Sequence, residues 1–292
     1  MFPIQSYEKA DSVDDAIRLL SANPDAKPIA GGTDLLIRLR DGKKAFGHLV
    51  DIHDLAELKQ CDIDAAGTLL IGSGVRFADA LASDIIRNHL PHLHTAAGTV
   101  GGPQIRNIAT IGGNICNGVT SADSASPLLA SEAQLIIQGP AGRRETPLSD
   151  FFMGPGKVAL AQNEILIAFA ISRENYNGYG GDYYKFAMRE AMDIATIGCA
   201  ATCKVSHNTL VDLRLALGVA APTPIRCRNA ESVARGEPLT EGLLKKIETA
   251  VAEDVNPRTS WRASKEFRRH IIKELVRRVV RNAIHQAGGT IQ

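Results

Sequence analysis

Two pairs of adjacent glycines have the flanking residues expected of loops that bind an anion. The first pair lies in residues 29–34, Ile-Ala-Gly-Gly-Thr-Asp, and the second in residues 109–114, Ala-Thr-Ile-Gly-Gly-Asn. Glycine has no Cβ, so consecutive backbone N–H groups can turn toward one point and cradle a phosphate. Two such loops in one small domain predict a site for the pyrophosphate of a dinucleotide. Both pairs could instead be ordinary turns, because glycine commonly marks turns.

Neither glycine pair belongs to a common nucleotide-binding motif. The chain has no G-x-x-x-x-G-K-[ST] phosphate-binding loop, and no G-x-G-x-x-G follows a first predicted strand. The second pair precedes a Ser- and Thr-rich segment, residues 120–127, in which Asp123 is a short acceptor suited to a ribose or ribityl hydroxyl. Asp123 could equally be an acidic residue at the start of a helix before Pro127.

Length and composition predict a soluble globular protein of two domains. The 292 residues include 33 Lys and Arg against 32 Asp and Glu, which gives no general reason to expect nucleic acid or a membrane as a partner. No apolar stretch approaches the roughly 18 residues of a membrane span. The five cysteines have no metal-binding spacing, so we expect a cytoplasmic, reduced protein without a metal of its own. Metal-binding spacing is also absent among the histidines at 48, 53, 89, 92 and 94. We interpret His48, His53, His89, His92 and His94 as surface or capping residues.

Hydrophobic patterns and turn residues predict an α+β protein. Ser12 has the position of a helix N-cap, with Asp14 and Asp15 in the first turn. The first half is expected to contain helices at residues 77–90, 92–98 and 127–130, strands at 27–30, 48–52, 69–73, 133–138, 143–147 and 164–171, and a helix or strand at 35–39. Residues 175–182 are the predicted domain linker.

The second half is predicted to be a small sheet followed by helices. Residues 182–188, 197–205 and 210–218 alternate as a three-stranded antiparallel meander, and helices are expected at 230–234, 240–251 and 264–287. An apolar stripe recurs every four residues in the last helix, at Phe267, Ile271, Leu275, Val279 and Ala283. Residues 256–292 contain nine Lys and Arg against two acidic residues, so this helix is expected to be a docking or interdomain surface, or a solvated cationic face.

Four motifs in order resemble the FAD-binding subunit of the molybdenum hydroxylases, the xanthine dehydrogenase family. They are A-G-G-T-D at residues 30–34, T-I-G-G-N at 110–114 followed by S-x-D, K-F-x-x-R-x-x-x-D-I-A at 185–195, and G-V-A-A-P-T-P-I-R at 218–226. The resemblance covers nearly the whole chain. It implies a two-lobed FAD-binding domain of the PCMH (vanillyl-alcohol-oxidase-like) type at residues 1–176, with lobes of about 1–55 and 56–176. A C-terminal flavoprotein domain at 177–292 would carry the three-stranded sheet and a helical bundle.

The resemblance also implies a set of FAD-binding residues. The first loop would hold the pyrophosphate. Thr33 would donate its hydroxyl, and Asp34 would fix the loop by accepting backbone N–H groups. The second loop, residues 109–114, would form the opposite wall of the site and is called the second wall below. A residue in the strand at 164–166 would contact the flavin through its backbone, and Lys185 would lie near the polar edge of the ring, with Arg189 and Asp193 in the loop beside it. The full set is Lys27, Ile29, Ala30, Gly31, Gly32, Thr33, Asp34, Ala109, Thr110, Ile111, Gly112, Gly113, Asn114, Asp123, Ile165, Leu166 and Lys185.

The family relationship implies an electron-transfer subunit with non-covalent FAD and no catalytic side chain of its own. Electrons would come from a [2Fe-2S] partner subunit and leave to NAD or another acceptor, while molybdopterin would reside in a large partner subunit of a heterotrimer. Xanthine is the expected substrate of the complex, with carbon monoxide, nicotinate or an aldehyde as alternatives. A non-catalytic nucleotide-binding module is the alternative from a different functional class.

Overall fold

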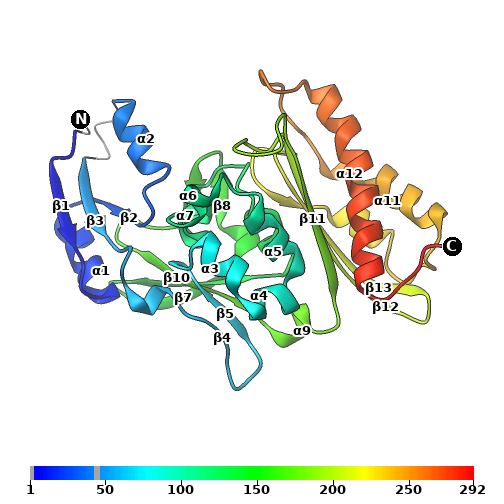
Figure 1. Ribbon diagram of the computed structural model, residues 1–292, viewed down its shortest axis with the longest axis horizontal. Coiled ribbons are helices and arrows are strands. Elements are labelled where there is room, and N and C mark those ends of the chain that lie inside the picture. Colours follow the sequence, from blue (N-terminus) through cyan, green and yellow to red (C-terminus); the bar gives the residue numbers. More distant parts are fainter. Residues whose placement is uncertain (1–2, 43–46) are drawn as a thin grey trace.

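Three main sheets follow one another along the molecule, each with its own helices (Figure 1). The computed structural model describes residues 3–42 and 47–292. The N-terminal unit contains a three-stranded sheet, the middle unit a five-stranded sheet, and the C-terminal unit a four-stranded sheet. A two-stranded ribbon, β8 (Phe152–Gly154) and β9 (Lys157–Val158), belongs to the middle part of the chain.

The N-terminal unit is a parallel sheet of order β1-β3-β2 crossed by one helix. The helix α1 (Val13–Ala22) begins where predicted, because the Ser12 side chain accepts the N–H of Asp15 at 3.0 Å. The segment left open as helix or strand is the short helix α2 (Leu35–Arg40). The other elements are β1 (Ser6–Lys9), β2 (Lys27–Ile29), β3 (His48–Asp51) and the 3-10 helix η2 (Ala56–Leu58).

The middle unit is built around β10 (Ile165–Ile171), the central strand of an antiparallel sheet of order β4-β5-β10-β6-β7. Its sequence, Ile-Leu-Ile-Ala-Phe-Ala-Ile, is apolar throughout, as a strand buried on both faces requires. The other strands are β4 (Cys61–Ile63), β5 (Leu69–Gly72), β6 (Gln134–Gly139) and β7 (Gly142–Pro147).

Short helices cover one face of the five-stranded sheet. The single helix predicted over residues 77–90 is wrong: the chain breaks at Ser83, whose side chain accepts the N–H of Ile86 and starts a second helix. The helices are α3 (Phe77–Ala82), α4 (Asp84–His89), α5 (Pro91–Gly98), α6 (Pro103–Arg106), α7 (Ile111–Cys116), α8 (Ala125–Ala130) and the 3-10 helix η3 (Leu148–Asp150).

The C-terminal unit contains the predicted meander of β11 (Gly180–Phe186), β12 (Ile197–Ser206) and β13 (Thr209–Gly218). The sheet has a fourth strand, β14 (Ile225–Arg226), which is too short to show an alternating pattern. The predicted linker is largely ordered structure, since α9 (Arg173–Tyr176) and β11 occupy most of it. The remaining helices are α10 (Arg228–Ser232), α11 (Glu241–Asp254) and α12 (Lys265–Gln286).

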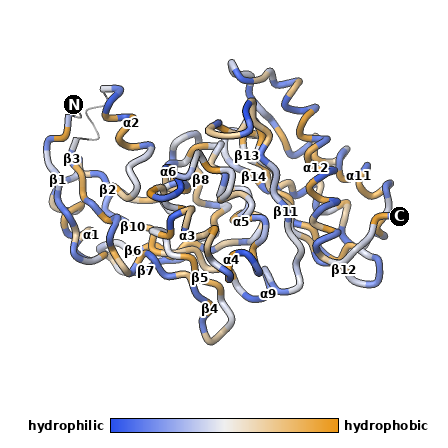
Figure 2. The backbone as a smooth tube through the Cα atoms, viewed as in Figure 1, coloured by the Kyte–Doolittle hydropathy of each residue, from blue (hydrophilic) through white to orange (hydrophobic). Residues whose placement is uncertain are grey.

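The four-stranded sheet is buried on both faces. Ala200 on β12 joins the core of the middle unit, whereas its neighbours Cys199 and Ala201 face the core formed with α11 and α12. This alternation follows from the two-residue period of a strand. Figure 2 shows hydrophobic segments along the interior strands and alternating colours along the outer helices. None of the helices described by the structure is long and apolar enough to cross a membrane.

The apolar stripe predicted on α12 is only partly correct. Leu275 and Val279 are buried against the sheet, but Phe267 is 45% exposed and Arg268 is buried in its place. A helix repeats every 3.6 residues, so a stripe drawn at every fourth residue drifts around the axis over several turns. On the outer surface, Arg278 and Arg281 form ion pairs with Glu274 and Glu241. The inner face packs on β11 and β12, and the docking role stays a prediction.

Candidate functional site

The first glycine loop leaves β2 and enters α2 with its amides available. The N–H groups of residues 31–34 donate no hydrogen bond to the part of the chain that the structure describes. Gly32 has a φ of 68°, a left-handed conformation that glycine adopts without strain. Asp34 does not pin this loop as predicted: it is exposed, and its side chain makes no capping hydrogen bond at the start of α2. The loop is therefore a cradle of backbone donors with the charge of Asp34 at its edge.

The second glycine pair is not a cradle of donors, which corrects the prediction. Residues 111–116 form α7, and its first amides are already used: Gly112 donates to the Ser73 carbonyl at 2.8 Å, and Gly113 to the Thr110 hydroxyl at 3.0 Å. Glycine is needed at 112 for packing, because a Cβ there would lie 2.5 Å from the Cβ of Ser73. This pair therefore allows α7 to pack closely against the turn that follows β5, and its N–H groups are not free.

The two glycine segments nevertheless meet in space. A Cβ placed on Gly31 would lie 2.2 Å from the carbonyl oxygen of Ile108 and 2.9 Å from the Cα of Ala109. A second contact joins the same segments, because the Arg38 guanidinium on α2 donates to the side-chain carbonyl of Asn117, just beyond α7. The N-terminal and middle units thus touch where the first loop faces the start of the second.

Asp123 and Lys185, predicted separately, form one buried ion pair. The Lys185 ammonium donates to Asp123 Oδ2 at 2.8 Å and to the Thr99 carbonyl at 3.0 Å, and the two side chains are only 8% and 9% exposed. The Tyr183 hydroxyl donates to the other carboxylate oxygen at 2.8 Å. Burial raises the pKa of Asp123 above its usual value, and the charge of Lys185 acts in the opposite direction.

Sequence reasoning missed Tyr183 as a member of this cluster. Tyr183 and Lys185 are two residues apart on β11, so their side chains lie on the same face of the strand. This two-residue spacing could have predicted from the sequence that Tyr183 lies beside Lys185. Burial raises the pKa of Tyr183 well above its usual value, with the adjacent carboxylate of Asp123 acting in the same direction. The phenol therefore remains a proton donor to Asp123 at any ordinary pH.

The strand residues predicted to approach the cofactor lie at the start of β10. The side chains of Ile165 and Leu166 are buried in the apolar cores, so only their backbone could contact a ligand. On one side they pair with β6, whereas pairing with β5 begins at Ala168. Lys27 lies half-buried on β2, next to the first loop.

The loop at residues 187–196 is held in shape by Asp193. Its carboxylate accepts the N–H groups of Met188 and Arg189, each at 3.0 Å, and of Ile194 at 2.9 Å. A Cβ on Gly102 would lie 2.7 Å from the sulfur of Met192, so this loop rests on the segment that precedes the second glycine pair. Its predicted place beside the flavin ring stays a prediction.

His92 is not a surface residue, contrary to the prediction. It is 2% exposed, its Nε2 lies 2.7 Å from the Ser131 hydroxyl, and burial lowers its pKa to about 4. It lies beside Gly181 on β11, where a Cβ would lie 2.5 Å from its Nδ1. Within the described residues, no group of His, Cys, Asp and Glu side chains could hold a metal ion.

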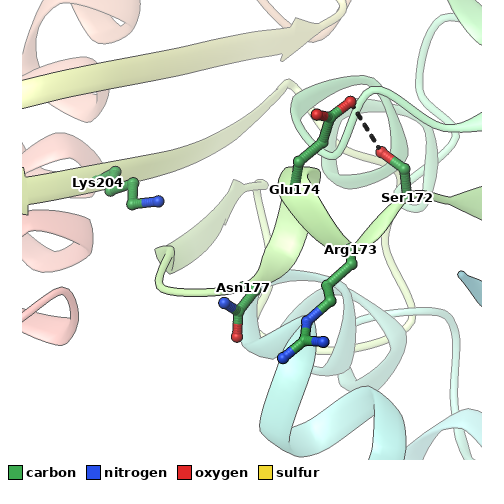
Figure 3. A pocket seen from close by; sticks show the side chains of 5 residues that line it. All are labelled: Ser172, Arg173, Glu174, Asn177 and Lys204. Atoms are coloured by element: carbon green, nitrogen blue, oxygen red, sulfur yellow. Dashed lines mark hydrogen bonds between the residues drawn. The ribbon is translucent and has the colours of Figure 1, made fainter. Parts of the chain in front are cut away.

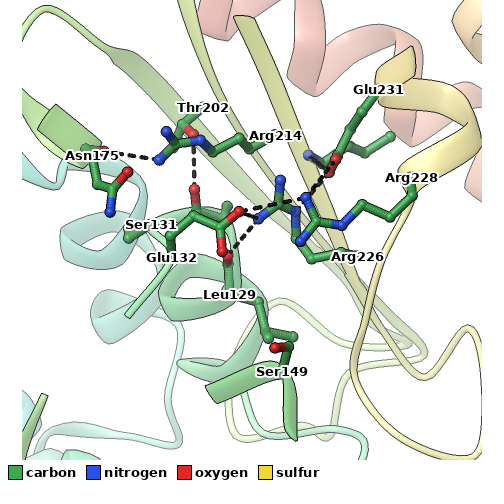
Figure 4. Close-up of polar contacts among 12 residues, drawn as sticks. Leu129, Ser131, Glu132, Ser149, Asn175, Thr202, Arg214, Arg226, Arg228 and Glu231 are labelled. Carbon is green, nitrogen blue, oxygen red and sulfur yellow. Dashed lines mark hydrogen bonds and ion pairs between the residues drawn. The ribbon is translucent and has the colours of Figure 1, made fainter. Parts of the chain in front are cut away.

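A polar network joins the middle and C-terminal units (Figure 4). The buried Arg226 guanidinium forms ion pairs with Glu132 at 2.7 Å and Glu231 at 2.6 Å, and donates to the Leu129 carbonyl. Arg228 lies beside the same two acids. Arg226 ends the 218–226 motif, and this network gives the residue its role: it links Glu132 of the middle unit to Glu231 of the C-terminal unit.

The hollow shown in Figure 3 is separate from these groups. It is a shallow depression of about 450 Å³ lined by Ser172, Arg173, Glu174, Asn177 and Lys204, and contains none of the predicted site residues. The candidate site is therefore defined by the glycine segments and the Asp123–Lys185 pair rather than by this surface depression.

Comparison with known proteins gives matches over almost the whole chain. The family model described as the FAD binding domain in molybdopterin dehydrogenase matches residues 2–173, and the model described as the CO dehydrogenase flavoprotein C-terminal domain matches residues 182–283. The chain is 50% identical, over the full length of both proteins, to the xanthine dehydrogenase FAD-binding subunit of Escherichia coli O157:H7.

More distant relatives share the same length and fold. The carbon monoxide dehydrogenase medium chain of Hydrogenophaga pseudoflava is 31% identical over 282 residues, which cover 96% of this chain and 97% of that protein. A solved structure of carbon monoxide dehydrogenase from the same organism superposes with a TM-score of 0.93 at 30% identity, covering 98% of this chain and 99% of the other.

Proposed function

Because the chain belongs to the FAD-binding subunits of the molybdenum hydroxylase family, we propose that it binds FAD non-covalently and carries electrons within a xanthine dehydrogenase complex. In this family molybdopterin and the [2Fe-2S] clusters belong to the partner subunits. The 50% identity to a xanthine dehydrogenase subunit, against 31% to a carbon monoxide dehydrogenase chain, favours xanthine as the substrate of the complex.

The contact between Gly31 and residues 108–109 is the observation that carries the FAD site. It sets a row of unused N–H groups beside the second wall, in the arrangement that suits a pyrophosphate. The N–H groups of residues 31–34 would donate to phosphate oxygens, and the Thr33 hydroxyl would add a donor. The second segment would act as a rigid wall. The proposed set remains Lys27, Ile29, Ala30, Gly31, Gly32, Thr33, Asp34, Ala109, Thr110, Ile111, Gly112, Gly113, Asn114, Asp123, Ile165, Leu166 and Lys185.

The Asp123–Lys185 pair would orient the flavin end of the cofactor. Each Asp123 oxygen holds one protein donor and can accept another, so a cofactor hydroxyl can be bound without breaking the ion pair. Lys185 is fixed by the Thr99 carbonyl as well, and its charge is therefore held in one place. When bound, FAD supplies two-electron storage between a one-electron donor and a hydride acceptor.

We propose NAD as that acceptor, a large molybdenum-binding and a small [2Fe-2S] subunit as partners, and the cytoplasm as the location. The interval between the two family models, residues 174–181, supports a division into domains at 1–176 and 177–292. Xanthine-dependent reduction of NAD by the purified complex tests the substrate and the acceptor together. Turnover of carbon monoxide or nicotinate in place of xanthine would contradict the proposed substrate.

The FAD site is tested by the flavin content of Gly31→Ala. The added Cβ would collide with the Ile108 carbonyl, so the first loop must move away from the second wall. We expect the purified variant to lose its flavin absorbance. Gly242→Ala in α11 is the matched control, because Gly242 has no left-handed φ and an added Cβ would lie 3.5 Å from the Thr240 hydroxyl oxygen, an ordinary van der Waals contact. A yellow Gly31→Ala protein with unchanged FAD stoichiometry would rule out this loop as the pyrophosphate site.

A further inference from the structure

Three arginines gather where the loop before β12 meets the start of α12. Arg268 lies in the first turns of α12, and Arg258 and Arg262 lie in the segment that leads into it. Arg268 is only 2% exposed. Its guanidinium donates to the Thr196 carbonyl and to the Ser260 hydroxyl, the latter at 2.8 Å. We call these three residues the arginine cluster.

The arginine cluster has no counter-charge among the described residues. No Asp or Glu lies within 4.0 Å of Arg258, Arg262 or Arg268 in that part of the chain. Burial, followed by the charges of Arg258 and Arg262, lowers the pKa of Arg268. The contrast with Arg226 is direct, because that buried guanidinium contacts two carboxylates. A buried charge usually has such a partner, so the arginine cluster lacks a negative group.

Polar atoms in and beside the arginine cluster have no hydrogen-bond partner among the described residues. They are the buried Nε atoms of Arg262 and Arg268 and the buried hydroxyl of Thr196. Beside them, the Arg262 guanidinium stacks on the Trp261 ring at 4.3 Å, and that ring is 77% exposed. An exposed aromatic ring beside neighbouring guanidinium groups suits a phosphate carried by a planar base.

We propose that the arginine cluster binds a phosphate group, free or carried by a nucleotide. Arg258 is exposed and Arg262 half-buried, so both can reach the ligand directly, while Arg268 beneath them adds positive charge and holds the segment to the loop end at Thr196. A nucleotide base would stack on Trp261. The site lies apart from the first glycine loop and does not depend on the FAD assignment.

The test is phosphate binding by the full-length, FAD-loaded protein at constant ionic strength. We expect inorganic phosphate to bind saturably in calorimetry, and Arg262→Gln and Arg258→Gln each to weaken the affinity at least tenfold. Arg269→Gln is the matched control, since it removes one exposed charge next to Arg268. All variants should keep full flavin content, which separates this result from the FAD proposal. Absence of saturable binding, or equal affinity in Arg262→Gln, would overturn the site.

AMP and adenosine identify the source of the phosphate. Tighter binding of AMP than of inorganic phosphate, reduced to the phosphate level by Trp261→Ala, assigns the site to a nucleotide. Equal affinities for AMP and inorganic phosphate, unaffected by Trp261→Ala, assign it to free phosphate. Adenosine binding as well as AMP would show that the arginines do not recognise a phosphate and would refute the proposal.

Discussion

Replacing Lys185 with Met should expose the energetic role of its ion pair with Asp123. The two groups are 2.8 Å apart, and both side chains are less than a tenth exposed. Removing one partner of a buried pair leaves an uncompensated charge and typically lowers the free energy of unfolding by about 3–5 kcal/mol. We expect a loss of this size for Lys185→Met at pH 8, measured by urea denaturation of the purified protein.

The loss should depend on pH in a definite direction. Burial already raises the pKa of Asp123, and without Lys185 the pKa of this carboxyl must rise further. A group whose pKa is raised in the folded state stabilises the protein while it is protonated, and that stability is lost as pH rises through the folded pKa. Lys185→Met should therefore be closest to the wild type near pH 5 and furthest from it at pH 8.

The double variant Lys185→Met/Asp123→Asn supplies the control. The asparagine amide would carry no charge, and its carbonyl oxygen could still accept the Tyr183 hydroxyl, so the double variant should be more stable at pH 8 than Lys185→Met alone. We expect a coupling energy of about 1–3 kcal/mol from the double-mutant cycle. Additive effects of the two single substitutions, or a loss independent of pH, would refute a buried charge pair at this position.

The same substitution affects the proposed cofactor site. FAD should remain bound to Lys185→Met, because the first loop is unchanged. Its reduction potential should fall at pH 8, where a positive charge has been removed beside an ionised Asp123, and less at pH 5. An unchanged potential at both pH values would place Lys185 away from the flavin.

Two further predictions concern the contacts between the units. Because burial lowers the pKa of His92 to about 4, neutral His92 stabilises the folded protein at pH values above the imidazole's unfolded pKa, and about 3 kcal/mol of the unfolding free energy should be lost between pH 7 and pH 4. The variant His92→Gln should lack this pH-dependent loss in acid denaturation. Identical acid denaturation curves for the variant and the wild type would contradict the prediction. Arg226→Met leaves Glu132 and Glu231 without their buried cation and should reduce the unfolding free energy, measured by urea denaturation, by about 3–5 kcal/mol. As a control, Arg228→Met removes an exposed guanidinium and should change the unfolding free energy by less than about 1 kcal/mol. Equal losses in the two variants would show that burial of Arg226 is unimportant.

Local patterns predicted most of the elements and failed where a distant segment imposed the structure. The cap at Ser12 and the three long strands of the meander were predicted, because their signals lie within a few residues. The stripe on α12 was only partly predicted, since the sheet beneath selects the buried face. The two-residue β14 could not be predicted, because its position depends on pairing with β13.

The amino-acid sequence alone determined the four ordered motifs and, through them, the family and its cofactor. It also placed the first glycine loop, whose need for a left-handed Gly32 is local. Only the tertiary structure decided what each motif residue contacts. Gly112 is a glycine because Ser73 lies against it, and Asp123 lies beside Lys185 although 62 residues separate them. Such contacts depend on how the units pack together, and no pattern of neighbouring residues contains that information.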